Sequence, residues 1–210
     1  EAYNLPGIAN TTAKLIYPSM HWSYMKHNTG LFVNNGYSLN FNIAGTIPYF
    51  SNKAGFSQYS ISYKDLHTLE KTDTRLLLTG SLAYTNINSI KNLPLSLQLF
   101  AGGAQSIRGY EFNSIGPGKC LLIASAEIQQ KIYKSLYVTT FYDTGNVSDI
   151  KYITKKLRTG TGIGLAWITP IGTLELSAAK AISRNNKPWV IQFSMGPFLW
   201  LENYLYGRSF

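Results

Sequence analysis

The chain has 210 residues, of which 14% are charged and 14% aromatic, and its formal net charge is +9. So few charges are unusual for a soluble domain, which carries about 25%, and a mean hydropathy near zero is too low for a bundle of membrane helices. No run of about 18 apolar residues is present, as a membrane-spanning helix would require. The class that fits this composition is the transmembrane β-barrel, where outward apolar residues alternate with polar residues of the lumen.

The charged and metal-binding residue types narrow the set of partners. The cations are spread along the chain and do not form the stripe that nucleic acid binding needs. Two interpretations of the net charge stay open: solvated loops, or attraction to the phosphates of outer-membrane lipid and lipopolysaccharide. The single cysteine is Cys120, and the three histidines lie far apart. We therefore expect no internal disulfide, no metal site and no cofactor.

Nine segments carry the patterns of β-strands, after a lead-in over residues 1–10. The first, 11–26, contains Pro18, which favours an edge position or a bulge because proline donates no backbone hydrogen bond. Residues 37–44 alternate apolar and polar side chains at every step, as expected of a sheet with two different faces. The predicted strands are 11–26, 37–44, 57–66, 74–84, 120–132, 136–143, 157–169, 173–182 and 189–199.

The connections in the second half alternate between short and long, which is typical of barrels with tight periplasmic turns and long outer loops. Bacterial barrels close with an even number of strands. A count of nine therefore means either that one strand has been missed or that the sheet is part of a larger barrel.

The segment 99–118 lies between two predicted strands and is too long and too rich in glycine for a tight turn. Loops of this length without secondary structure of their own are usually functional or disordered. Apolar residues such as Ile107 and Tyr110 favour packing against another part of the protein. The single cation in its middle is Arg108, and an arginine held in a packed loop needs a carboxylate partner.

Two acids are placed where such a loop can reach them, Glu127 and Asp143 on neighbouring predicted strands. Because a charge is costly in lipid, both carboxylates are expected to point into the lumen. Arg108 would be able to bridge them if its loop folds into the lumen. In the other interpretation, each acid faces lumen water without a partner.

An enzyme is not expected. The run Gly160-Thr161-Gly162-Ile163-Gly164 lies within a strand, opens no helix and lacks the Lys-Ser/Thr of a phosphate loop. Its glycines favour a barrel bend or a close approach of the inserted loop. Glu127 and Asp143 could be imagined as a glycosidase pair, but no sugar-binding context accompanies them.

The loop segment Ser106-Ile107-Arg108-Gly109-Tyr110 resembles the (V/I/L)RG(F/Y) motif in the sixth outer loop of the Omp85 superfamily. The lead-in to this loop, residues 99–103, resembles the FFAGG of the TamA branch. Further matches are 141–146 with FxDxGN, 160–172 with GxGxG…W-SPxGP, 119–127 with the strand after the loop, and 18–23 and 36–39 with strand openings. The resemblance spans about residues 12–199, and Thr173 departs from it by replacing the second proline of SPxGP.

The resemblance implies an all-β, antiparallel transmembrane β-barrel of about sixteen strands. Residues 11–199 would be its C-terminal nine or so strands, with POTRA domains and the early strands lying outside the chain. Residues 200–210 would form a tail of unknown role. The resemblance also implies that Arg108 contacts both Glu127 and Asp143.

The implied function is the insertion of β-barrel proteins, such as autotransporters, into the outer membrane of a Gram-negative bacterium through a lateral seam. The expected partners are client outer-membrane proteins and an inner-membrane or periplasmic assembly protein. The seam strand would be the last one, with Trp189, Ile191 and Phe193 on one face and weak pairing at Gly196 and Pro197. The alternatives are a two-partner secretion pore for one secreted protein and a passive porin.

Overall fold

The computed structural model describes residues 2–3, 11–12, 16–28, 33–46, 55–170, 172–184 and 189–196. This part of the chain is built from strands, with two short 3₁₀ helices, η2 (Ile90–Asn92) and η3 (Leu95–Leu97), and no α-helix. None of the described helices is long and apolar enough to cross a membrane.

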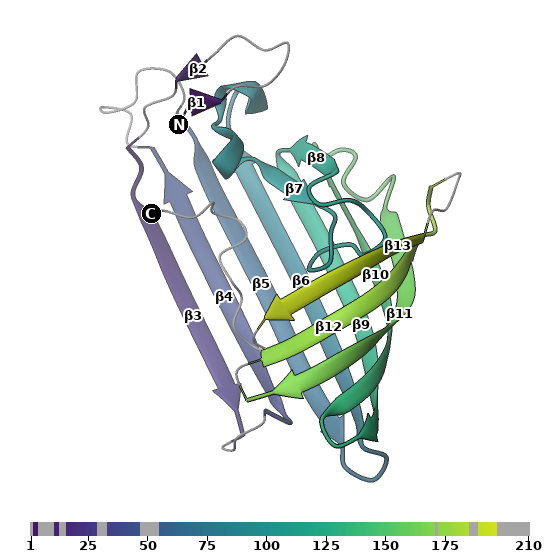
Figure 1. The fold of residues 1–210 in the computed structure, drawn as a ribbon. Helices are drawn as coiled ribbons and strands as arrows, with labels where there is room; N and C mark the ends of the chain where they lie inside the picture. The colour runs from purple at the N-terminus through teal and green to yellow at the C-terminus, as the bar shows by residue number, and fades with distance from the viewer. Residues whose placement is uncertain are drawn as a thin grey trace.

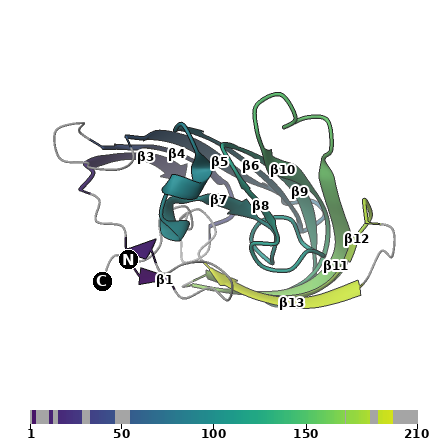
Figure 2. The ribbon, with the colours of Figure 1, turned by 90° about the horizontal axis from the view of Figure 1, so that it is seen from above.

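Nine strands form one antiparallel sheet, which confirms the all-β prediction and the strand count (Figure 1). The sheet curves around an interior and is open between its edge strands β3 and β13, so these nine strands do not close a barrel (Figure 2). Its order is β13-β12-β11-β10-β9-β6-β5-β4-β3. The bounds are β3 (Ser19–His27), β4 (Gly36–Gly45), β5 (Ser57–Leu69), β6 (Thr74–Asn86), β9 (Cys120–Tyr133), β10 (Leu136–Ser148), β11 (Arg158–Thr169), β12 (Gly172–Ala181) and β13 (Trp189–Gly196).

The first predicted strand, 11–26, was wrong at its start. Residues 11–12 form the separate strand β2 (Thr11–Thr12), which pairs with β1 (Ala2–Tyr3) inside the predicted lead-in. The edge strand β3 begins only after Pro18, since proline offers no N–H to a ladder. The carbonyl of Pro18 still accepts a hydrogen bond from the Gly45 N–H at 3.2 Å.

Strand β10 continues beyond its predicted end at residue 143 to Ser148. Gly145 is paired within the sheet to Ile123 and Arg158. Asp143 therefore lies well inside a strand. At the C-terminal end, β13 ends at Gly196, and residues 197–210, including Pro197 and the predicted tail, lie outside the described residues.

The two faces of the sheet have opposite character. Large apolar side chains on the outer face are exposed, such as Ile163, Leu165 and Trp167 on β11 and the row from Trp189 to Met195 on β13. The inner face buries polar side chains, which include Ser38, Asn40, Ser60, Ser62, Gln129, Thr139 and Ser177. Exposed apolar and buried polar residues are the reverse of a soluble protein and match a barrel wall with a polar lumen.

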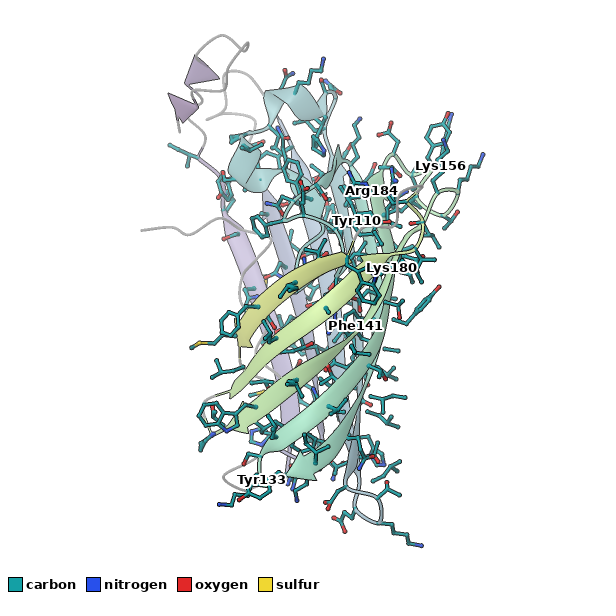
Figure 3. The ribbon with its side chains drawn as sticks, turned by 45° about the vertical axis from the view of Figure 1, so that its right-hand side comes forward. Tyr110, Tyr133, Phe141, Lys156, Lys180 and Arg184 are labelled. Atoms are coloured by element: carbon teal, nitrogen blue, oxygen red, sulfur yellow. The ribbon has the colours of Figure 1, made fainter. Side chains whose placement is uncertain are left out.

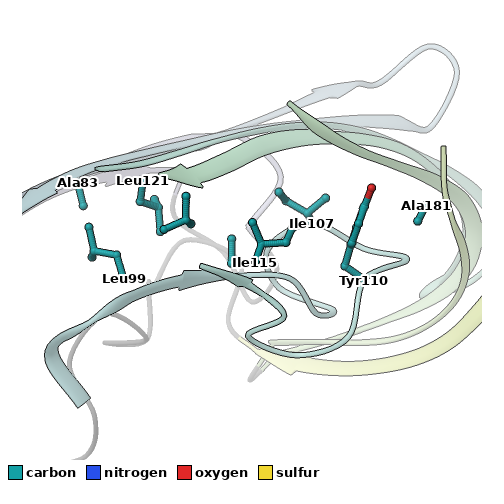
Figure 4. Close-up of a cluster of buried hydrophobic side chains, with 9 residues drawn as sticks. Ala83, Leu99, Ile107, Tyr110, Ile115, Leu121 and Ala181 are labelled. Atoms are coloured by element: carbon teal, nitrogen blue, oxygen red, sulfur yellow. The ribbon is translucent and has the colours of Figure 1, made fainter. Parts of the chain in front are cut away.

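The long loop packs, as predicted, but it has secondary structure at its base. Short strands β7 (Leu99–Ala101) and β8 (Ile115–Gly118) pair with each other, and the chain between them folds into the curve of the sheet (Figure 2). Nine buried apolar residues join the loop to the wall (Figure 4): Ala83, Leu99, Ala101, Ile107, Tyr110, Ile115, Leu121, Val147 and Ala181. The apolar side chains of the loop thus hold it against β6, β9, β10 and β12.

Candidate functional site

Arg108 lies inside the curve of the sheet and binds Asp143 of β10 with three hydrogen bonds. Its backbone N–H and its Nε both donate to Asp143 Oδ2, at 3.0 and 2.8 Å, and its Nη2 donates to Oδ1 at 2.9 Å. Arg108 is 6% exposed and Asp143 is fully buried. A bidentate arginine–carboxylate pair fixes both the distance and the orientation of the two groups. Asp143 therefore positions the Arg108 side chain and, through the Arg108 N–H, the backbone of the loop.

Two further acids contact the same guanidinium group. Nη1 donates to Glu127 Oε2 of β9 at 2.5 Å and to Glu175 Oε1 of β12 at 3.0 Å. Sequence reasoning named Glu127 and Asp143 but missed Glu175. A signal was present: Glu175 lies between the outward-facing Leu174 and Leu176, so the lumen argument applied to the other two acids places it inward as well.

Neighbouring side chains complete the coordination of this buried charge. Ser125 Oγ donates to Asp143 Oδ1 at 2.5 Å, and Gln129 Nε2 donates to Glu127 Oε1 at 2.7 Å. The Arg108 guanidinium carbon lies 3.4 Å from the centroid of the Phe141 ring, within the range of a cation–π contact. Buried carboxylates with satisfied oxygens avoid the cost of an unpaired polar group.

The charge of Arg108 is stabilised despite its burial. Burial by itself lowers the pKa of Arg108, but hydrogen bonding and charge from Asp143, with the charges of Glu127 and Glu175, raise this pKa above its ordinary value. The guanidinium therefore remains a cation at any physiological pH. The ion pairs of Arg108 thus connect the loop to three strands, β9, β10 and β12.

Two glycines allow the loop backbone to lie directly on β11 and β12. A Cβ added at Gly160 of β11 would overlap the Arg108 carbonyl oxygen. On the loop side, Gly109 has a φ of +89°, and a Cβ there would lie 2.8 Å from the Ala181 nitrogen. Of the two interpretations of the glycine run, close approach of the loop is the one that Gly160 supports.

The loop also contacts β13 at the edge of the sheet. Gln192 Oε1 accepts from the Gly109 N–H at 3.0 Å, and Gln192 Nε2 donates to the Tyr110 carbonyl at 2.9 Å. Gln105 Nε2 donates to the Met195 carbonyl at 3.2 Å. The side-chain amide of Gln192 therefore accepts one hydrogen bond from the loop backbone and donates another to it, as a neighbouring strand would. Sequence reasoning selected the outward neighbours Ile191 and Phe193 and passed over Gln192.

The remaining predicted site residues lie in the loop or on β13, away from the Arg108 ion pairs. Ile107 is fully buried in the apolar cluster, and Ser106 Oγ accepts from the Gly102 N–H at 3.2 Å. Trp189, Ile191 and Phe193 are exposed on the outer face of β13, and Gly196 is its last residue, opposite Thr173. Across the described ranges, no three His, Cys, Asp or Glu side chains gather in a way that could hold a metal ion.

An antiparallel wall with an apolar outer face and a polar inner face is typical of a transmembrane β-barrel. The chain matches the Omp85 superfamily domain over residues 8–198, and it therefore belongs to the Omp85 superfamily. This confirms the resemblance at the level of the superfamily.

Among solved structures, the chain is similar to the crystal structure of BamA from Haemophilus ducreyi lacking POTRA domains 1–3. The identity is 27% and the TM-score is 0.67. The similarity covers 83% of this chain and 40% of that chain, so the chain spans less than half the length of that protein.

Proposed function

We propose that the chain is the C-terminal barrel part of an outer-membrane factor that inserts β-barrel proteins in a Gram-negative bacterium. The FFAGG-like lead-in at residues 99–103 favours the TamA branch, with autotransporters among the clients and an inner-membrane or periplasmic assembly partner. The observation that carries the proposal is the loop anchored at Arg108, which joins the inner wall to the edge strand β13.

The proposed mechanism uses the free edge of β13. This strand pairs with β12 on one side only, so its other side carries backbone N–H and C=O groups that a client strand can bind by β-augmentation. In the full barrel, this edge would meet the first strand in a weak seam. Gly196 and Pro197 favour a weak end of the seam strand because proline donates no ladder hydrogen bond.

The loop would keep β13 in register while the seam opens. Gln192 and Gln105 connect β13 to the loop, and Arg108 connects the loop to β9, β10 and β12. A client strand would then meet an edge that is held from inside and from β12. The outward side chains Trp189, Ile191 and Phe193 would anchor this edge in lipid.

The two alternative functions, a porin and a two-partner secretion pore, require an open lumen. A porin or a two-partner secretion pore needs a passage, whereas here the loop between β7 and β8 packs its apolar residues on the wall. A secretion pore shares the loop motif and would require this loop to move. Steady ion conductance together with a dedicated secreted substrate would favour the pore.

A photo-crosslinking experiment tests the proposal on the full protein in outer-membrane vesicles. A photoreactive amino acid replaces either Phe193 on β13 or Leu165 on β11. Both side chains face outward and are exposed, but β11 is paired on both sides. We expect client adducts from position 193 during assembly and only background from position 165. Equal adducts from the two positions, or none from 193 while clients assemble, would contradict the proposal.

A further inference from the structure

Six cations gather at one end of strands β10–β13. This basic rim consists of Lys151, Lys155, Lys156, Arg158, Lys180 and Arg184. Within 149–158 and 180–184 the only acid is Asp149. Figure 3 shows Lys156 and Arg184 at the upper end of the wall and Lys180 below them, with Tyr133 far away at the turn between β9 and β10.

None of the basic-rim cations forms an ion pair with an acid among the described residues. Five of these cations are exposed: Lys151, Lys155, Lys156, Arg158 and Arg184. Like charges held close together repel one another. The basic rim is therefore a surface that an external anion would stabilise.

The position of Lys180 indicates the level of the basic rim relative to the membrane. On β12, Leu176 and Lys180 lie on the outer face, while Glu175 and Ser177 point inward and are buried. The Lys180 Nζ lies 5.5 Å from the centroid of the Trp189 ring, which is itself exposed on the outer face of β13. A lysine beside an aromatic ring on the lipid-facing surface is typical of the level where apolar tails meet polar headgroups.

The basic rim lies at the end of the wall that carries the long loops. The loop 87–119 and the loop 149–157 leave the sheet at this end, whereas the opposite end has the two-residue turn of Lys134 and Ser135. In barrels of this class, the long loops are extracellular and the short turns periplasmic. The headgroups at the level of Lys180 are therefore those of the outer leaflet.

We infer that the basic rim binds the phosphate groups of lipid A in the outer leaflet, beside the edge of β13. Exposed apolar side chains between the cations, Ile150, Tyr152 and Leu157, suit an amphiphilic ligand better than a free phosphate ion. The inference rests on the proposed outer-membrane location and is independent of client insertion.

The test measures binding of fluorescent lipid A to the purified full-length protein in nanodiscs. The variant carries Lys156→Gln, Lys180→Gln and Arg184→Gln. Its matched control carries Lys71→Gln and Lys134→Gln at the opposite end, where Lys134 contacts Tyr133 much as Lys180 contacts Trp189. We expect the triple variant to lose affinity for bisphosphorylated lipid A by about tenfold or more. The control should bind within about twofold of the wild type, allowing for screening of distant charges.

Two further arms identify the ligand. Dephosphorylated lipid A should bind the wild type and the triple variant equally weakly, and inorganic phosphate at millimolar concentration should not displace labelled lipid A. Equal lipid A affinity in the triple variant and the wild type, an equal loss in the control, or displacement by inorganic phosphate would each overturn the inference. Heat-modifiability on a gel checks that every variant is folded, and client adducts at position 193 report separately on the proposed function.

Discussion

Replacement of Arg108 by glutamate should destabilise the folded barrel of the full-length protein by about 3–5 kcal/mol and abolish client assembly. Breaking a buried ion pair costs this much because the remaining charges stay buried without compensation. Here three acids would lose their shared cation and gain a fourth negative neighbour. Urea unfolding in detergent measures the stability, and protease protection of a newly inserted client measures assembly.

Two charge-swap double variants test whether the loss comes from the ion pairs of Arg108. Adding Asp143→Lys or Glu127→Lys to Arg108→Glu should restore part of both readouts, because each double variant again places a cation between carboxylates. The exposed Lys71→Glu change reverses the same charge outside the site and should alter stability by no more than about 0.5 kcal/mol. Wild-type stability and assembly in the Arg108→Glu variant would contradict an anchored loop.

A single methyl group at position 160 should displace the loop. In Gly160→Ala, the new Cβ would overlap the Arg108 carbonyl oxygen, so the loop backbone has to move away from β11 and pull Arg108 from Asp143. Overpacking of this kind costs about 1–3 kcal/mol, and we expect a similar loss of barrel stability together with slower client assembly.

Gly80→Ala is the matched control for this change. Gly80 also lies within a strand, β6, but the nearest atom to its added Cβ is the Ile123 carbonyl oxygen at 4.0 Å. Its urea midpoint should stay close to that of the wild type. If the two alanine variants lose the same stability, the loss reflects strand glycines in general and not the approach of the loop.

Alternation of side chains was enough to predict the sheet and its faces. A period of two fixes which residues point inward, so Asp143 and Glu127 could be assigned to the lumen from their strands alone. The cost of a buried charge then required a partner for Arg108. The resemblance to the Omp85 superfamily added the expectation that these three residues meet.

The residues that sequence reasoning missed depend on curvature and on neutral groups. Glu175 is two strands away from Asp143, and only the bend of the sheet brings both carboxylates to one guanidinium group. Gln192 carries no charge, so nothing in the sequence demands a partner for it. Strands β7 and β8 have only three and four residues, and β8 contains two glycines and a proline, which leaves too short a pattern to recognise.

The most direct test of the mechanism is a reversible lock on the seam. In a Cys120→Ser background, cysteines replace Ser194 on β13 and the residue opposite it on the strand that closes the full barrel. We expect client insertion to stop when the disulfide is oxidised and to return when it is reduced. A control disulfide between Ala178 and Ile191, which are paired across β12 and β13, should leave insertion unchanged. Full insertion activity with the seam disulfide oxidised would contradict a lateral opening at β13.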